Sequence, residues 1–210
     1  HVDASGKRDE SVLALAWLNS HHQSGIRNLM DQAVVQFARQ DAKFSAPLNY
    51  SKVDELPFDF VRRRLSIIVK DSRGDHLLVC KGAVEEMLGI ATHIMEGDTP
   101  VALDPARREQ LLALATEYNE DGFRVLLVAT RDIPKAQAQK QYNTADEHDL
   151  VIRGLLTFLD PPKETAGPAI AALQDIGVAV KVLTGDNAVV TSKICRQVGL
   201  APGTPLLGPQ

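Results

Sequence analysis

Two apolar runs around a short glycine-containing turn constrain the fold of this chain most strongly. Residues 64–70 read RLSIIVK and residues 76–80 read HLLVC, and Ser72, Arg73, Gly74 and Asp75 lie between them. Two strand-like runs joined by such a turn predict a β-hairpin. Antiparallel, hairpin-linked strands are therefore expected in the part of the chain that precedes residue 160.

Other patterns place helices and further strands around this hairpin. Apolar residues recur at helical spacing over residues 10–19 and 28–40, and Asn28 is a candidate N-cap for the second helix. We also expect a loop at 47–57, helices at 83–93 and 105–119, a turn at 97–100, strands at 124–131 and 150–159, and a mobile connection at 134–148.

The chain changes character at Asp160-Pro161-Pro162-Lys163. The expected order after this point is a helix at 165–176 ended by Gly177, a strand at 178–183, a turn at 184–186 and a helix ending at Gly199. This β-α-β-α alternation is typical of a parallel, doubly wound sheet. We therefore predict an α+β chain with two domains, residues 1–159 and residues 160–210.

Composition restricts the possible partners and compartments. The formal net charge is −4 and the pI is near 5.9, which argues against a nucleic-acid-binding protein, although Arg62, Arg63 and Arg64 form a local basic run. Cys80 and Cys195 lie in apolar surroundings, and we interpret them as reduced core thiols of a cytosolic compartment. No signal peptide or membrane-spanning run is visible, so the chain as given is expected to be soluble.

Two short motifs place phosphate-binding groups at strand ends. Thr184-Gly185-Asp186 follows an apolar run, where a hydroxyl and backbone N–H groups can hold phosphate oxygens. The local signal by itself favours the alternative that Asp186 or Asn187 only caps the next helix. Lys81 and Gly82 follow LLVC and can present an ammonium group and a close backbone to an anion, although the motif by itself favours a turn with an exposed lysine.

Two further side chains are candidates for ligand contacts. Arg124 follows Asp121-Gly122-Phe123 and can place a guanidinium group at a sheet edge, and Phe58 can stack on a base or pack in the core. No metal-ligand motif is present, since His21 and His22 are adjacent and are expected to be solvated. The chain also contains no P-loop, dinucleotide fingerprint or nucleophile elbow.

The order of the motifs carries more information than any one of them. PFDFVRRRLS, VCKGA, GFRVLLVATRD, LDPPKET and VLTGDN follow one another, and this series resembles the cytoplasmic part of P-type cation-transporting ATPases. Three segments are most similar to bacterial magnesium-transporting members of this family: AWLNSHHQSGIRNLMDQAV, LPFDFVRRRLSIIV and FLDPPKET. The resemblance implies a nucleotide-binding domain, built as an antiparallel sheet flanked by helices, and a partial haloacid-dehalogenase-like α/β phosphorylation segment.

The resemblance also implies roles for particular residues. Phe58 matches the aromatic residue that stacks on adenine, and the other matches to the nucleotide pocket are Asp31, Arg63, Lys81, Gly82 and Arg124. The matches to the region of the γ-phosphate and Mg²⁺ are Asp160, Thr184, Gly185 and Asp186. Phe58 and Arg63 have opposite parity on a regular strand, so both can face one ligand only if the chain turns between them.

The implied activity is transfer of the γ-phosphoryl group of MgATP to an aspartate, coupled to Mg²⁺ transport across a membrane. The D-K-T-G-T and G-D-G-x-N-D segments of the family are absent, so we expect them before His1 and after Gln210. This chain is then expected to bind ATP or ADP without turnover and to contain no catalytic residue. Its partners would be the actuator, phosphorylation and membrane domains, at the cytoplasmic face of the inner membrane.

Alternatives remain open at this point. The transported cation could differ, because its ligands would lie in membrane helices outside this chain. A free-standing haloacid-dehalogenase phosphatase would need an upstream D-x-D nucleophile, and the chain contains none. A non-catalytic interaction module, in which the Lys81 and Thr184 motifs are only turns, predicts no response to nucleotide. The residues after Asp160 are expected to be poorly ordered if their sheet is incomplete.

Overall fold

A computed structural model describes residues 1–24, 28–42, 44–159, 161–184, 188–204 and 206. The chain forms two compact units: the first contains residues 1–114 and 125–156, and the second contains residues 115–124 and 157–210. The domain boundary expected near Leu159 remains a prediction. No described helix is long and apolar enough to cross a membrane; the longest, α4, has 16 residues.

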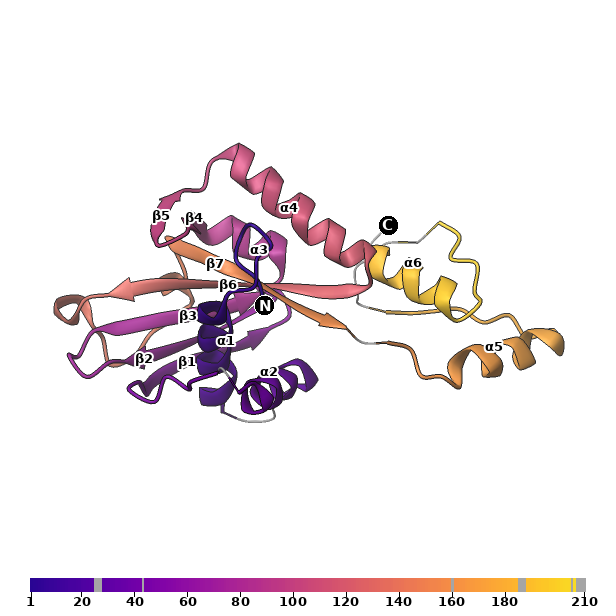
Figure 1. Cartoon of the computed structure of the whole chain (residues 1–210), viewed down its shortest axis with the longest axis horizontal. Helices are drawn as coiled ribbons and strands as arrows, with labels where there is room; N and C mark the ends of the chain where they lie inside the picture. The colour runs from indigo at the N-terminus through magenta and orange to yellow at the C-terminus, as the bar shows by residue number, and fades with distance from the viewer. Residues whose placement is uncertain (25–27, 43, 160, 185–187, 205, 207–210) are drawn as a thin grey trace. The chain divides into compact units, whose positions relative to one another are not determined.

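The first unit is built on a seven-stranded sheet in the order β1-β2-β3-β6-β7-β4-β5 (Figure 1). Its strands are β1 (Ser51–Asp59), β2 (Arg64–Lys70), β3 (His76–Gly82), β4 (Ala91–Glu96), β5 (Thr99–Ala102), β6 (Phe123–Ile133) and β7 (Leu150–Leu159). The hairpin expected from the sequence is formed by β2 and β3, with Lys70 opposite His76. β1 is a further antiparallel neighbour of β2, and β6 of β3.

The sheet is mixed, which corrects the expectation of a purely antiparallel one. β4 and β5 form a second hairpin, and β4 runs parallel to β7. A tight turn forces its two strands to be antiparallel, but β4 and β7 are far apart in sequence and no turn sets their relative direction. The α+β class with flanking helices is confirmed.

The helices of the structure are α1 (Glu10–His22), α2 (Leu29–Gln40), α3 (Val84–Ile90), α4 (Pro105–Glu120), α5 (Ala166–Asp175) and α6 (Ala188–Gln197), with short 3₁₀ helices η1 (Lys135–Gln137) and η2 (Thr144–Asp146). α1 packs on β2 and β3, and α2 packs on α1 (Figure 1). The predicted N-cap is confirmed, because the Asn28 side chain accepts a hydrogen bond of 2.9 Å from the backbone N–H of Asp31.

Two element predictions in the first unit were wrong. Residues 47–57 were expected to be a loop, but β1 starts at Ser51; it is an edge strand, where polar residues and Pro57 are tolerated. The helix expected over 83–93 ends at Ile90, because Ala91 to Glu96 pair with β5 and β7.

Residues 134–148, expected to be a mobile connection, contain η1 and η2 and bury Tyr142 and Glu147.

In the second unit, α5 and α6 share a small apolar cluster. Its buried members are Cys195, Val198 and Leu200, and the partly buried side chains packed against it are Ala166, Ile170 and Val180. The strand predicted over 178–183 is not formed, and Leu183 is 96% exposed. A strand needs hydrogen-bonded neighbours, and no strand in the described part of the second unit pairs with these residues.

Gly154 is required by a close backbone approach. Val2 pairs with Leu155 through two backbone hydrogen bonds of 2.8 and 3.0 Å, which places the N-terminal segment directly over β7. A Cβ atom on Gly154 would lie 2.1 Å from the Val2 carbonyl oxygen and 2.8 Å from Cγ2 of Val12. The backbone oxygen cannot yield without loss of this pairing, so the position excludes any side chain.

Gly154→Ala is therefore expected to lower the free energy of unfolding by about 1–3 kcal/mol, the usual range for overpacking. The measurement is urea denaturation followed by circular dichroism. Gly89→Ala is the matched control, because its added Cβ meets no atom within 4 Å and it lies in α3. Equal stability of the two variants would show that the N-terminal segment does not pack on β7.

Candidate functional site

The register of three adjacent strands brings several predicted site residues to one end of the sheet. Asp59 of β1 lies opposite Arg64 of β2, and Arg64 lies opposite Gly82 of β3. Neighbouring strands are roughly 4.8 Å apart, so these three positions span about 10 Å. Phe58, Arg63 and Lys81 are each next to one of them in sequence, and the structure therefore gathers them at the same end.

The turn between β1 and β2 resolves the parity conflict between Phe58 and Arg63. β1 ends at Asp59 and β2 begins at Arg64, so the chain reverses over residues 60–63. Arg63 has a φ of 48°, in the left-handed region. The Asp59 carboxylate accepts hydrogen bonds of 2.8 Å from the backbone N–H groups of Val61 and Arg62, which hold the turn. The chain thus turns between the two candidates, as a shared ligand would require.

The tip of this turn is exposed and apolar. Phe58 is 47% exposed, and Phe60 and Val61 are 88% and 87% exposed. The rings of Phe58 and Phe60 meet edge to face with centroids 5.3 Å apart. Phe58 is therefore not a core aromatic residue, and an accessible aromatic ring is what stacking on a base requires.

Lys81 and Asp31, both candidates for nucleotide contacts, form a buried ion pair with each other. The Lys81 ammonium group donates to the Asp31 carboxylate and, at 2.8 Å, to the Ser20 hydroxyl. Ser20 in turn donates to Asp31 at 2.8 Å. The side chains of Lys81 and Asp31 are only 6% and 2% exposed. Burial lowers the pKa of Lys81, and the Asp31 carboxylate opposes this shift.

This pairing changes the interpretation of Lys81. An exposed turn lysine, which the short motif allowed, is ruled out. The alternating side chains of β3 explain the geometry: Lys81 points to the face covered by α1 and α2, and Cys80 to the opposite face, where its sulfur lies 3.5 Å from that of Met87. Burial raises the pKa of the Cys80 thiol to about 12, so this cysteine is an inert core residue.

Only glycine fits at position 82, because the neighbouring strand approaches its backbone closely. A Cβ atom at this position would lie 2.5 Å from Cβ of Arg64 and 2.9 Å from the carbonyl oxygen of Arg63. The backbone N–H of Ala83 donates to the same carbonyl oxygen at 3.0 Å. The close approach of two backbones at Gly82 therefore joins the end of β3 to the turn that carries Phe58.

The basic run of residues 62–64 is neutralised within the first unit. The buried Glu147 carboxylate accepts hydrogen bonds from Arg62 at 2.7 and 2.9 Å, from Nε of Arg64 at 2.7 Å and from Ser66 at 2.7 Å. Arg63 pairs with Glu86 at 2.9 Å. Arg62 also donates to the Pro57 carbonyl oxygen at 2.7 Å, and so it bridges both ends of the turn.

Glu147 and Ser20 are the site residues that sequence reasoning missed. Glu147 lies in a polar connection that gives no periodic signal, and Ser20 is one of several polar residues at the end of α1. Both are fully or almost fully buried, at 3% and 0% exposure. A buried carboxylate must have partners, but its partners are more than 80 residues away in sequence and cannot be identified from local pattern.

The remaining candidates lie in the second unit or outside the described residues. Arg124 lies in the second unit, at the start of β6, and Thr184 is exposed after α5. Asp160, Gly185 and Asp186 lie outside the described residues. Within the described residues, no group of three or more His, Cys, Asp and Glu side chains has a metal-binding arrangement.

Comparisons with known proteins agree with this arrangement. A family model described as P-type ATPase, cytoplasmic domain N, matches residues 6–165. The chain is 56% identical over its full length to "Magnesium-transporting ATPase, P-type 1" of Salmonella typhimurium strain LT2, and it covers 23% of that protein. It is 42% identical, over 99% of its length, to the protein of the same name from Escherichia coli K12, again covering 23%.

A more distant relative is "Calcium-transporting ATPase 2, endoplasmic reticulum-type" of Arabidopsis thaliana, which is 33% identical over 71% of this chain. The chain spans 23% of the length of each of the two magnesium-transporting relatives named above. The family match covers the entire mixed sheet together with the turn and buried pairs described above. This chain belongs to the P-type ATPase family, and its residues 6–165 match the model of that family's cytoplasmic domain N.

Proposed function

We propose that the first unit binds the adenine end of ATP at the sheet end formed by Phe58, Arg63, Lys81 and Gly82. The observation that carries this proposal is the exposed Phe58 ring, held by the strand register beside the ends of β2 and β3. Phe58 would stack on the base, and Arg63, half-exposed beside Glu86, would lie near the ligand. Asp31 and Lys81 would form the polar floor as one neutral pair.

We further propose that the complete protein is a magnesium-transporting P-type ATPase at the cytoplasmic face of the inner membrane. The relatives with this name, at 56% and 42% identity, support the cation assignment. The γ-phosphoryl group of MgATP would pass to an aspartate outside residues 1–210, because no D-K-T-G-T segment is present. Arg124, Asp160, Thr184, Gly185 and Asp186 would act near the phosphates and their Mg²⁺ in the assembled pump, by positioning and charge neutralisation.

Phe58→Ala is expected to weaken ATP binding about tenfold, since stacking of one base on an aromatic ring contributes roughly 1–3 kcal/mol. The fold should be unaffected because the ring is half-exposed. Isothermal titration calorimetry with ATP measures the dissociation constant, and Val61→Ala is the control: an exposed apolar residue of the same turn without an aromatic ring. Equal affinities of both variants would remove Phe58 from the site.

Amide chemical-shift mapping separates this proposal from a non-catalytic interaction module. ATP should shift resonances of Phe58, Arg63 and Gly82 in a saturable way. An interaction module in which the Lys81 motif is only a turn predicts no saturable shift at any of these positions. The same titration with GTP tests whether the base, rather than the phosphate chain, accounts for the affinity.

A further inference from the structure

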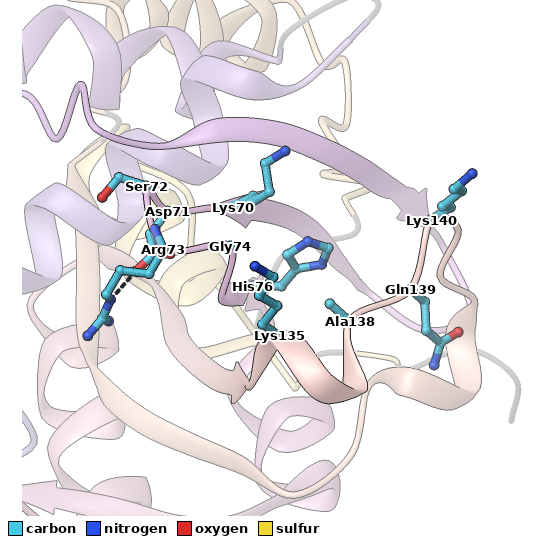
Figure 2. A pocket seen from close by; sticks show the side chains of 10 residues that line it. All are labelled: Lys70, Asp71, Ser72, Arg73, Gly74, His76, Lys135, Ala138, Gln139 and Lys140. Carbon is cyan, nitrogen blue, oxygen red and sulfur yellow. Dashed lines mark hydrogen bonds and ion pairs between the residues drawn. The ribbon is translucent and has the colours of Figure 1, made fainter.

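The opposite end of the same strands carries a pocket. The β2–β3 turn and residues 135–140 line a pocket of about 460 Å³ that is open to solvent (Figure 2). His76 at the start of β3 lines this cavity, whereas Gly82 at the end of β3 lies at the proposed nucleotide site. Gly82 lies six residue steps along the extended chain from His76, which corresponds to roughly 20 Å. The pocket is therefore not part of the nucleotide site.

The pocket collects positive charge in a chain that is acidic as a whole. Its lining includes Lys70, Arg73, Lys135 and Lys140 but only one carboxylate, that of Asp71 (Figure 2). The net charge of the complete chain is −4. Arg73 pairs with Asp71 and Asp75, and the three lysine side chains add positive charge that a multiply charged anion would offset.

The acidic groups nearby are used to shape the turn. Asp71 accepts hydrogen bonds of 2.9 Å from the backbone N–H groups of Arg73 and Asp75, and it pairs with the Arg73 side chain at 3.0 Å. Asp75 accepts a hydrogen bond of 2.9 Å from the backbone N–H of Lys135, which fastens the second wall to the first. The Lys135 side chain packs over Gly74, whose φ is 92°. These carboxylates thus organise the pocket and offset only part of its charge.

His76, which lines the pocket, belongs to a buried polar pair. His76 is 8% exposed and its Nδ1 lies 2.7 Å from the Tyr142 hydroxyl. That hydroxyl accepts a hydrogen bond of 3.1 Å from the backbone N–H of Gln139, and the backbone N–H of Tyr142 donates to Asp54 at 2.7 Å. The wall that bears Lys135 and Lys140 is therefore anchored to the sheet, and Figure 2 shows the imidazole beside Lys135. Its Nδ1 already contacts the Tyr142 hydroxyl.

We propose that this pocket binds a small, multiply charged phosphate anion of the pyrophosphate type. Lysine ammonium groups are compact point charges suited to phosphate oxygens, and Arg73 adds a planar donor. An anion with two or more charges matches the excess of cations among the residues that line the pocket. The ligand would be held by charge and hydrogen bonds, so its affinity would fall as salt concentration rises.

His76 provides a specific reporter for the proposed ligand. Burial lowers the pKa of His76, Lys70 lowers it further, and Asp71 and Asp75 oppose these effects. The other charged or titratable groups around the ring are Arg73, Lys135, Lys140 and Tyr142. An anion bound in the pocket stabilises the protonated imidazole, so the pKa of His76 should rise when the ligand is present.

The test is a titration of the 210-residue protein with inorganic pyrophosphate at constant ionic strength, followed by NMR. We expect saturable shifts at residues 70–76 and 135–140, a raised pKa of His76, and no shift at Phe58 or Gly82. Lys135→Ala/Lys140→Ala should weaken binding at least tenfold. The control Lys7→Ala/Arg39→Ala removes the same charge from exposed positions outside the pocket and should leave the affinity unchanged.

Three results would overturn the proposal. Linear, unsaturable shifts would mean that pyrophosphate does not bind. An equal loss of pyrophosphate affinity in the control variant would mean that the net charge of the protein, not the pocket, accounts for binding. Sedimentation with phosphatidylglycerol vesicles distinguishes a lipid headgroup from a free phosphate. Vesicle binding that depends on Lys135 and Lys140, without pyrophosphate binding, would assign the pocket to a membrane surface instead. ATP is not used in these experiments, so their outcome is independent of the nucleotide site.

Discussion

Lys81→Met is expected to lower the free energy of unfolding by about 3–5 kcal/mol, the cost of leaving one partner of a buried ion pair uncompensated. In this variant the Asp31 carboxylate, at 2% exposure, loses the lysine ammonium group and keeps the hydrogen bond from the Ser20 hydroxyl. Methionine fills most of the volume of the lysine stem, so the loss reports charge rather than a cavity. Chemical denaturation of the variant and the parent protein measures this difference.

The double variant Lys81→Met/Asp31→Leu provides the control. Removing both charges eliminates the uncompensated carboxylate. A protein in which apolar side chains replace a buried ion pair often keeps its stability. We therefore expect the double variant to be more stable than Lys81→Met, with a coupling energy measured by the full cycle. If Lys81→Met unfolds like the parent protein, Lys81 is not buried against Asp31 in solution.

This expectation alters how loss of ATP binding in a Lys81 variant should be interpreted. A lysine at an exposed strand end could be removed without effect on the fold, and its loss would then report ligand contact alone. Because Lys81 is buried, weaker binding by Lys81→Met combines a structural effect with a ligand effect. Phe58→Ala is the cleaner test of the site, since its ring is half-exposed.

Glu147→Gln is expected to cause a loss of similar size, again about 3–5 kcal/mol, because it leaves two guanidinium groups without their shared carboxylate. Arg62 and Arg64 are 19% and 13% exposed, and the Glu147 side chain is inaccessible to solvent. Since Arg62 also holds the Pro57 carbonyl oxygen, the turn that carries Phe58 should loosen. If the proposed function is correct, ATP affinity should fall together with stability.

Glu86→Gln is the matched control for this prediction. It removes the carboxylate that pairs with Arg63 at 2.9 Å, but here the arginine side chain is 54% exposed. An exposed pair of this kind contributes about 0–1 kcal/mol. Equal destabilisation by Glu86→Gln and Glu147→Gln would contradict a special role for Glu147. Thermal unfolding of both variants, with ATP titration of each folded protein, provides the comparison.

Local pattern was sufficient for those elements whose signals lie within a few residues. The β2–β3 hairpin follows from two apolar runs and a glycine turn, and the start of α2 follows from the Asn28 cap. Gly177 and Gly199 have φ values of 80° and 82° just after α5 and α6, as expected for helix ends. In each case the deciding interaction spans fewer than ten residues.

Predictions from local sequence pattern were wrong where strand formation depends on a neighbouring strand that is distant in the sequence. The apolar run at 178–183 reads as a strand, but a strand exists only if another strand is beside it, and none in the described part of the second unit is. Conversely, the polar residues from Ser51 onward form an edge strand because β2 supplies the hydrogen bonds. Strand formation depends on pairing between distant segments, which composition does not encode.

The amino-acid sequence alone determined the α+β class, the central hairpin, most helices and, through the order of its motifs, the P-type ATPase family. Only the tertiary structure decided that Lys81 is bound to Asp31 and Ser20, and that Glu147 holds Arg62 and Arg64 beside the Phe58 turn. The physical reason is that a charge can be buried only where opposite charges and donors surround it, and these come from residues 50 to 85 positions away.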